Sequence, residues 1–163
     1  MADVIAILEQ MRASSGHAET TGLTNDVILD FASRDNTLVQ AIEEAGVRQG
    51  EFSNELLMMA ESDLVSHLQE DYVNFYAPAT INPYVAVAAR GPWIVTSHGA
   101  VVHDNGGYGM LGGGHGPEEI IDAMSKNHVM ANVMTPSISQ ARLAAALKKE
   151  LGHSTGSCPF SKF

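Results

Sequence analysis

The chain is poor in cysteine, in aromatic side chains and in basic residues. Its single cysteine, Cys158, cannot form an intramolecular disulfide, which favours a reducing, cytoplasmic location. Lysine and arginine total 9 against 19 acidic residues, so the chain lacks the positive surface that binds nucleic acid phosphates. No apolar run has the length of a membrane-spanning helix, and residues 1–12 do not have the pattern of a signal peptide. We therefore expect neither nucleic acid nor membrane as a partner.

The first part of the chain carries helical patterns. Its 163 residues suffice for one ordinary domain with its own core. Apolar residues recur at helical spacing around residues 4–11, 27–45 and 56–68, so residues 2–75 are predicted to be mostly helical. Thr24 or Asn25 is expected to cap one helix, and Ser53 and Asn54 to begin another. The Met and Leu residues of that last helix are expected to lie in the core or in a subunit interface.

The second part combines short strands with helices. Residues 84–89, 93–97 and 100–104 read as strands, the last two joined by His98-Gly99. Helices are predicted over residues 118–126, with Ile120, Ile121 and Met124 facing inward, and over residues 139–151. An apolar tail, residues 153–163, is typical of a segment that leads into a buried strand. The prediction is an α+β chain with a helical N-terminal region, 1–74, and a second region, 75–163, containing a small antiparallel β-meander.

The segment between the hairpin and the next helix is unusually rich in glycine. Its glycines lie at positions 106, 107, 109, 112, 113, 114 and 116, and such density indicates backbone with positive φ or close contacts. Residues 107–112 formally match the dinucleotide fingerprint GxGxxG. However, further glycines and Pro117 delay the helix, and no acid follows around residue 130, so we give a nucleotide site little weight.

The remaining chemical motifs are weak. His98, His103, Asp104 and His115 lack the spacing of a metal site and are expected to be solvated or hydrogen-bonded, with Asp104 anchoring the hairpin. No basic side chain except Lys162 is near Cys158 to activate its thiol. The sequence therefore predicts no catalytic, cofactor-binding or metal-binding residue.

Taken in order, these motifs resemble the N-terminal region of class III (ω-type) aminotransferases, the fold-type I enzymes that use pyridoxal phosphate (PLP). That family has an apolar hairpin, then Leu-Asp, then a small-residue loop that ends in Gly-His-x-x-Pro or similar. Here His103-Asp104 takes the Leu-Asp place, and residues 113–117, Gly-Gly-His-Gly-Pro, stand at the end of the loop. The helix at 118–126, the break at 135–137 and the helix at 141–152 continue the resemblance over residues 75–163.

The resemblance implies the N-terminal part of a larger, homodimeric enzyme. Region 75–163 would be a small-domain segment that leads into a PLP-binding large domain, and the complete enzyme would transfer an amino group between an amine or ω-amino acid and a 2-oxo acid. The phosphate loop, the aspartate at the pyridine nitrogen and the Schiff-base lysine would lie outside this chain. Its own lysines, at positions 126, 148, 149 and 162, do not match that context. The chain alone is therefore expected neither to bind PLP covalently nor to transaminate.

The resemblance also implies one set of site residues. Tyr108, Gly109 and Met110 correspond to the family's loop that faces the substrate, often across the dimer interface. The alternative is that they only pack a tight glycine corner. A different class of function also stays open, namely a non-catalytic helical interaction domain in which residues 1–74 carry the function.

Overall fold

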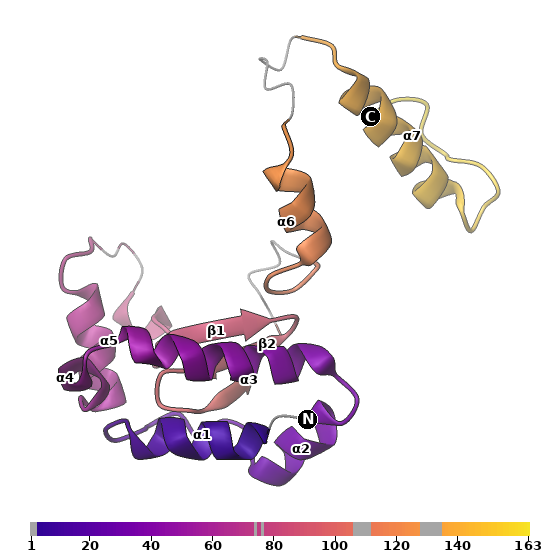
Figure 1. Ribbon diagram of the computed structural model, residues 1–163. Coiled ribbons are helices and arrows are strands. Elements are labelled where there is room, and N and C mark those ends of the chain that lie inside the picture. Colours follow the sequence, from indigo (N-terminus) through magenta and orange to yellow (C-terminus); the bar gives the residue numbers. More distant parts are fainter. Residues whose placement is uncertain (1–2, 74, 76, 106–111, 128–134) are drawn as a thin grey trace. The chain divides into compact units, whose positions relative to one another are not determined.

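A computed structural model describes residues 3–73, 75, 77–105, 112–127 and 135–163. It confirms an α+β chain with seven α-helices and a three-stranded antiparallel sheet in the described residues. Contacts divide the chain into two compact units, Met1–Ile121 and Asp122–Phe163, and each is described by itself (Figure 1). None of the helices in these residues is long and apolar enough to cross a membrane.

The first three helices form because each has a polar start and an apolar face. Helix α1, Val4–Ala13, begins where the Asp3 carboxylate accepts a hydrogen bond from the Ala6 N–H (3.1 Å). Helix α2, Asn25–Ala32, has Thr24 at its N-cap, and α3, Asn36–Arg48, begins after Asp35. The apolar faces of the three helices are buried, and they consist of Val4, Leu8, Met11, Ile28, Leu38, Ala41, Ile42 and Ala45.

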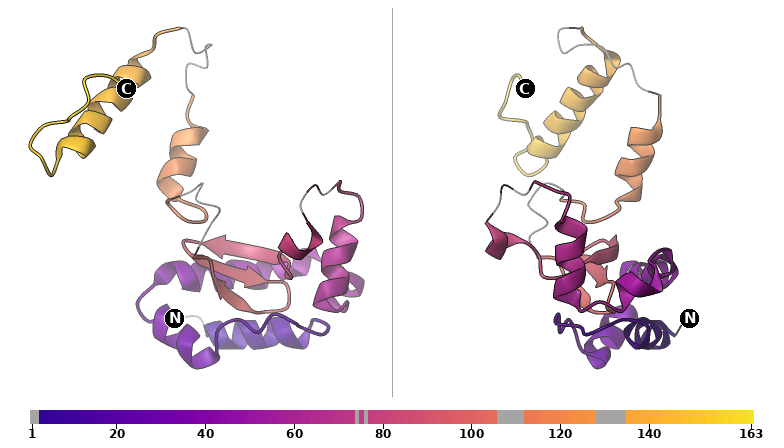
Figure 2. Two further views of the ribbon diagram at one scale, coloured as in Figure 1. Left: turned by 180° about the vertical axis from the view of Figure 1, so that it is seen from behind. Right: turned by 90° about the vertical axis from the view of Figure 1, so that its left-hand side faces the viewer.

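The sheet is a β-meander packed on α3. Strands β1 (Ala86–Arg90), β2 (Trp93–Thr96) and β3 (Val101–His103) lie in that order, with Arg90 opposite Trp93 and Val95 opposite Val101. Helix α3 contacts β1 and β2 as well as α1 and α2, and it lies along one face of the sheet (Figures 1 and 2). Helices and sheet therefore share one apolar core.

The predicted helix after Ser53 is two helices in the structure. Helix α4, Asn54–Leu57, follows the one-turn 3-10 helix η1 (Gln49–Glu51), and α5 spans Glu61–Gln69. The backbone between α4 and α5 bonds instead to the segment after α1: Gly16 N–H donates to the Leu57 carbonyl (2.8 Å), and Glu61 N–H donates to the His17 carbonyl (2.9 Å). A second one-turn 3-10 helix, η2 (Pro78–Thr80), leads toward the sheet.

One expectation for the C-terminal part is wrong. Helix α6, Glu118–Ser125, is present as predicted, but Ile120, Ile121 and Met124 do not face inward: they are exposed, Met124 by 77 %. The tail after α7 (Ile138–Gly152) forms turns, and the expectation that it leads into a buried strand stays a prediction. Helix α7 itself matches the prediction and begins with a capping box made by Ser137 and Gln140.

Candidate functional site

The hairpin is held to the helices through Trp93, the first residue of β2. Its ring is buried and lies 5.0 Å from the Phe31 ring and 4.8 Å from the His103 ring, measured between centroids. Its indole N–H donates a hydrogen bond to Asp35 Oδ2 (2.7 Å). Trp93 is the single tryptophan of the chain. It therefore fixes the hairpin to the start of α3 and provides a spectroscopic probe of that junction.

Asp35 has two structural roles at this junction. Asp35 caps α3, because its Oδ1 accepts hydrogen bonds from the backbone N–H (2.9 Å) and the hydroxyl (2.6 Å) of Thr37. Its Oδ2 accepts the hydrogen bond from the Trp93 indole N–H. Burial by itself raises the pKa of the Asp35 carboxyl. The hydrogen bonds from Thr37, Trp93 and the Leu38 backbone outweigh burial and hold the pKa below its ordinary value of 3.8. The folded state therefore favours the carboxylate form of Asp35, which is ionised at neutral pH.

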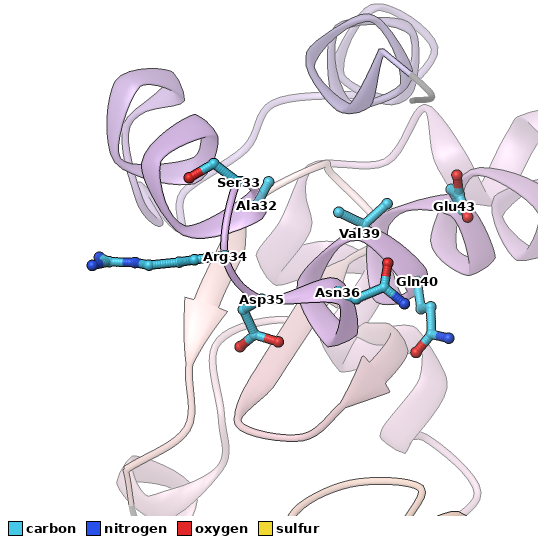
Figure 3. A pocket seen from close by; sticks show the side chains of 8 residues that line it. All are labelled: Ala32, Ser33, Arg34, Asp35, Asn36, Val39, Gln40 and Glu43. Atoms are coloured by element: carbon cyan, nitrogen blue, oxygen red, sulfur yellow. The ribbon is translucent and has the colours of Figure 1, made fainter.

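A polar hollow of about 530 Å³ lies at the turn between α2 and α3. Figure 3 shows its lining, with the Arg34 side chain extending away from the turn. The Asp35 oxygens are already hydrogen-bonded, and Arg34 pairs with Asp30 on the outside of α2 (2.6 Å). Because Arg34 and Asp35 have these partners, and no other basic side chain lines the hollow, we assign it no ligand.

The two ends of the glycine segment are joined to one another. His115 Nε2 lies 2.8 Å from Asp104 Oδ2, and Gly91 and His115 exchange two backbone hydrogen bonds (2.9 and 2.8 Å). The Asp104 N–H also donates to the Pro92 carbonyl (2.7 Å). Asp104 therefore anchors the hairpin, as expected from the sequence. Burial and, secondly, the negative charge of Asp104 raise the pKa of the Tyr84 hydroxyl above its ordinary value.

The predicted substrate-lining residues Tyr108, Gly109 and Met110 lie outside the described residues. The structure does place the residues that flank them, because Asp104 and His115 form the base from which this segment begins and ends. The assignment of Tyr108, Gly109 and Met110 to a substrate pocket stays a prediction.

Gly114 gives a direct test of the base of this segment. Its φ is +73°, and a Cβ there would lie 2.7 Å from the Gly91 carbonyl oxygen. We expect Gly114→Ala to lower the free energy of unfolding by about 1–3 kcal/mol, because it combines left-handed backbone with a backbone clash. The measurement is urea unfolding followed by Trp93 fluorescence. Gly112→Ala is the control, since a Cβ there meets no atom within 4 Å. Equal losses of stability for the two substitutions would contradict the close contact between Gly114 and the Gly91 carbonyl.

The histidines of the hairpin are hydrogen-bonded, as predicted. His98 is buried, its Nε2 donates to the Met59 carbonyl (3.0 Å), and its Nδ1 accepts from the Ser97 hydroxyl (3.0 Å). The exposed His103 lies 2.6 Å from Asn105 Oδ1. Within the described ranges, no three His, Cys, Asp or Glu side chains are grouped to hold a metal ion. These histidines therefore stabilise turns.

The sequence did not predict the contacts of two charged residues, the buried Glu61 and the partly buried Arg90. Glu61 is fully buried, and its Oε2 accepts hydrogen bonds from the N–H groups of Glu19 (2.8 Å) and Thr20 (2.6 Å). The Nε of Arg90 donates to Glu44 Oε2 (2.9 Å). An Arg at a strand end and a Glu at a helix start are ordinary surface residues in a sequence, so neither pattern indicated these contacts.

The four lysines lie outside any hollow described above. Lys126, Lys148, Lys149 and Lys162 are all exposed and belong to the unit Asp122–Phe163. A PLP aldimine requires a lysine directed into a pocket that also holds the phosphate and the ring. The described residues do not offer that combination, so they do not fit the cofactor by themselves.

Comparison of the chain with protein-family models, with curated proteins and with solved structures gives no match.

Proposed function

We propose that the chain is the N-terminal portion of a class III (ω-type) aminotransferase-like enzyme of fold type I. The complete, homodimeric and cytoplasmic enzyme would use PLP to transfer an amino group between an amine or ω-amino acid and a 2-oxo acid. The observation that carries the proposal is the order of elements. The β2–β3 hairpin, Asp104, the glycine segment ending at His115-Gly116-Pro117, α6, a break and α7 follow one another as in that family.

Exposed apolar side chains on the last two helices support the proposal. Ile120, Ile121 and Met124 form one side of α6, and Leu143 on α7 is 61 % exposed. Leu151, Phe160 and Phe163 are also exposed. Apolar side chains in such numbers are typical of surfaces that another part of a protein covers. The remainder of the enzyme is the cover we propose, and it would supply the lysine and the phosphate site that the described residues lack.

The proposal predicts where PLP is attached. The protein should be purified from the cells that make it with a tag at its N-terminus, reduced with borohydride, and digested for peptide mass mapping. We expect a yellow preparation with a pyridoxyl-lysine in a peptide outside residues 1–163. The intact mass should exceed the 17.4 kDa of this chain or reveal a second polypeptide.

Two outcomes would contradict the proposal. A colourless preparation containing a single 17.4 kDa polypeptide would favour the helical interaction domain instead. A pyridoxyl group on Lys126, Lys148, Lys149 or Lys162 would show that the chain binds the cofactor by itself. A matched sample that is not reduced controls for lysine modification during handling.

A further inference from the structure

The buried carboxylate of Glu61, the first residue of α5, has one oxygen without a partner. Glu61 is fully buried, and its Oε2 accepts hydrogen bonds from the N–H groups of Glu19 (2.8 Å) and Thr20 (2.6 Å). Its Oε1 and the hydroxyl oxygen of Thr20 are also buried, and neither makes a hydrogen bond among the residues that the structure describes. Because the bond to Oε2 holds Thr20 beside Glu61, these two oxygens belong to one buried polar site.

The charge of this carboxylate has no full counter-charge in the described part of the chain. Burying an ionised carboxylate is costly unless the carboxylate is paired. Residues 1–121 contain no lysine, and their four arginines bind groups other than Glu61. The N-terminus of α5 supplies a partial charge of only about +0.5, which Glu61 shares with Asp63. The negative charge that remains favours a bound cation.

The donor atoms at the site determine which cation fits. Glu61 offers a carboxylate oxygen and Thr20 a hydroxyl oxygen, and the backbone of residues 17–20, which lies outside helices and strands, supplies carbonyl oxygens. Oxygen donors favour hard cations over zinc or copper. One buried carboxylate balances one positive charge, whereas Ca²⁺ takes six to eight oxygen ligands and Mg²⁺ gives up its waters reluctantly. The site is therefore suited to a monovalent alkali cation.

We propose that Glu61 Oε1 and Thr20 Oγ1 bind one monovalent alkali-metal cation, Na⁺ or K⁺. The cation joins the start of α5 to the segment after α1, where the Glu61 N–H already donates to the His17 carbonyl (2.9 Å). Residues 1–121 carry 17 acidic and 4 basic side chains, and this negative field raises the local concentration of cations. The site needs neither PLP nor another part of an enzyme, so it is separate from the proposed function and can be tested on this chain alone.

The test is urea unfolding of the full chain, followed by Trp93 fluorescence, in tetramethylammonium chloride that is replaced stepwise by NaCl or KCl. The total salt concentration is constant, so charge screening does not change, and tetramethylammonium is too bulky to enter a buried site. We expect the urea midpoint to rise with the logarithm of the Na⁺ or K⁺ concentration, because the cation binds the folded state. An unchanged midpoint overturns the proposal, and so does a larger rise with CaCl₂ at the same ionic strength.

Variants locate the cation in the protein. Glu61→Gln keeps an oxygen that accepts from the Glu19 and Thr20 N–H groups but replaces the other oxygen by an NH₂ group, so we expect the dependence on Na⁺ and K⁺ to disappear. Thr20→Val removes the hydroxyl oxygen at nearly constant volume and should weaken the apparent affinity for the cation by at least about 10-fold. Thr21→Val is the matched control, because Thr21 is exposed on the same segment.

A direct readout separates binding from stability. The folded protein should broaden the NMR signal of sodium ions, and K⁺ should reverse the broadening by competition. Circular dichroism establishes that each variant is folded. Broadening or a midpoint shift that persists in Glu61→Gln overturns the proposal, and so do equal affinities in Thr20→Val and Thr21→Val.

Discussion

Replacing Ile42 by alanine is expected to lower the free energy of unfolding by about 2–5 kcal/mol, the range for large-to-small changes at fully buried aliphatic positions. Ile42 is fully buried on α3, the helix that contacts β1 and β2 as well as α1 and α2. A cavity there affects both layers of the core at once. Urea unfolding followed by Trp93 fluorescence measures the loss, because Trp93 belongs to the same core.

Val47→Ala on the same helix is the control for Ile42→Ala. Val47 is 77 % exposed, so its truncation removes little buried surface and should change stability by no more than about 0.5 kcal/mol. Similar losses for the two variants would contradict burial of Ile42 against the sheet as the cause, because alanine has a higher helix propensity than either residue and propensity alone predicts no loss. A small loss for Ile42→Ala alone would contradict the packing of α3 on the sheet.

Local patterns predicted most of the helices and the β-meander. The hairpin was identified because two β-type runs flank His98-Gly99, and Gly99 has the positive φ of +74° that its turn requires. Helix α7 is predictable because its apolar spacing is regular and a break at residues 135–137 precedes it. In both cases the determining residues are close in sequence, so no tertiary information was needed.

The sequence predictions fail where the structure depends on residues that are far apart in the sequence. Nothing in residues 53–68 indicates the break before Glu61, because the bonds that stabilise it come from Gly16 and His17. On α6 the apolar side was recognised correctly, but periodicity shows only that a helix has such a side. It does not show what covers it. Ile120, Ile121 and Met124 were therefore placed inward by a pattern that contains no information about a partner.

The candidate site was predictable only in part. The density of glycines indicates that the segment between the hairpin and α6 makes close backbone contacts. The contact between Asp104 and His115 agrees with the expectation that Asp104 anchors the hairpin. The pairing of those two residues, and of Arg90 with Glu44, depends on how the hairpin lies against α3. Such pairings join residues far apart in sequence, and a single sequence does not specify them.

Asp35→Ala is the second substitution with a large expected effect, about 2–4 kcal/mol of lost stability. It removes the cap of α3, usually worth about 1 kcal/mol, and leaves the buried Trp93 N–H without its acceptor, which costs about 1–3 kcal/mol. Asp3→Ala separates the two contributions, because Asp3 also caps a helix and its side chain binds, among the residues that the structure describes, the Ala6 N–H alone. Its loss should stay near 1 kcal/mol, and an equal loss in both variants would contradict a stabilising Asp35–Trp93 bond.

The pH dependence of stability gives an independent measure of Asp35. Its folded-state pKa lies below the ordinary value of 3.8, so the stability it contributes is complete above that value and is lost as pH falls through it toward the folded-state pKa. As the pH falls from 5 through 3.8, the free energy of unfolding should therefore decrease more for the wild-type protein than for Asp35→Ala. The difference in free energy of unfolding between the two proteins should become smaller on acidification. The comparison requires urea unfolding of both proteins at several pH values, with Asp3→Ala alongside. A difference that stays constant with pH would mean that the Asp35 carboxylate charge contributes nothing to the junction between α3 and the hairpin.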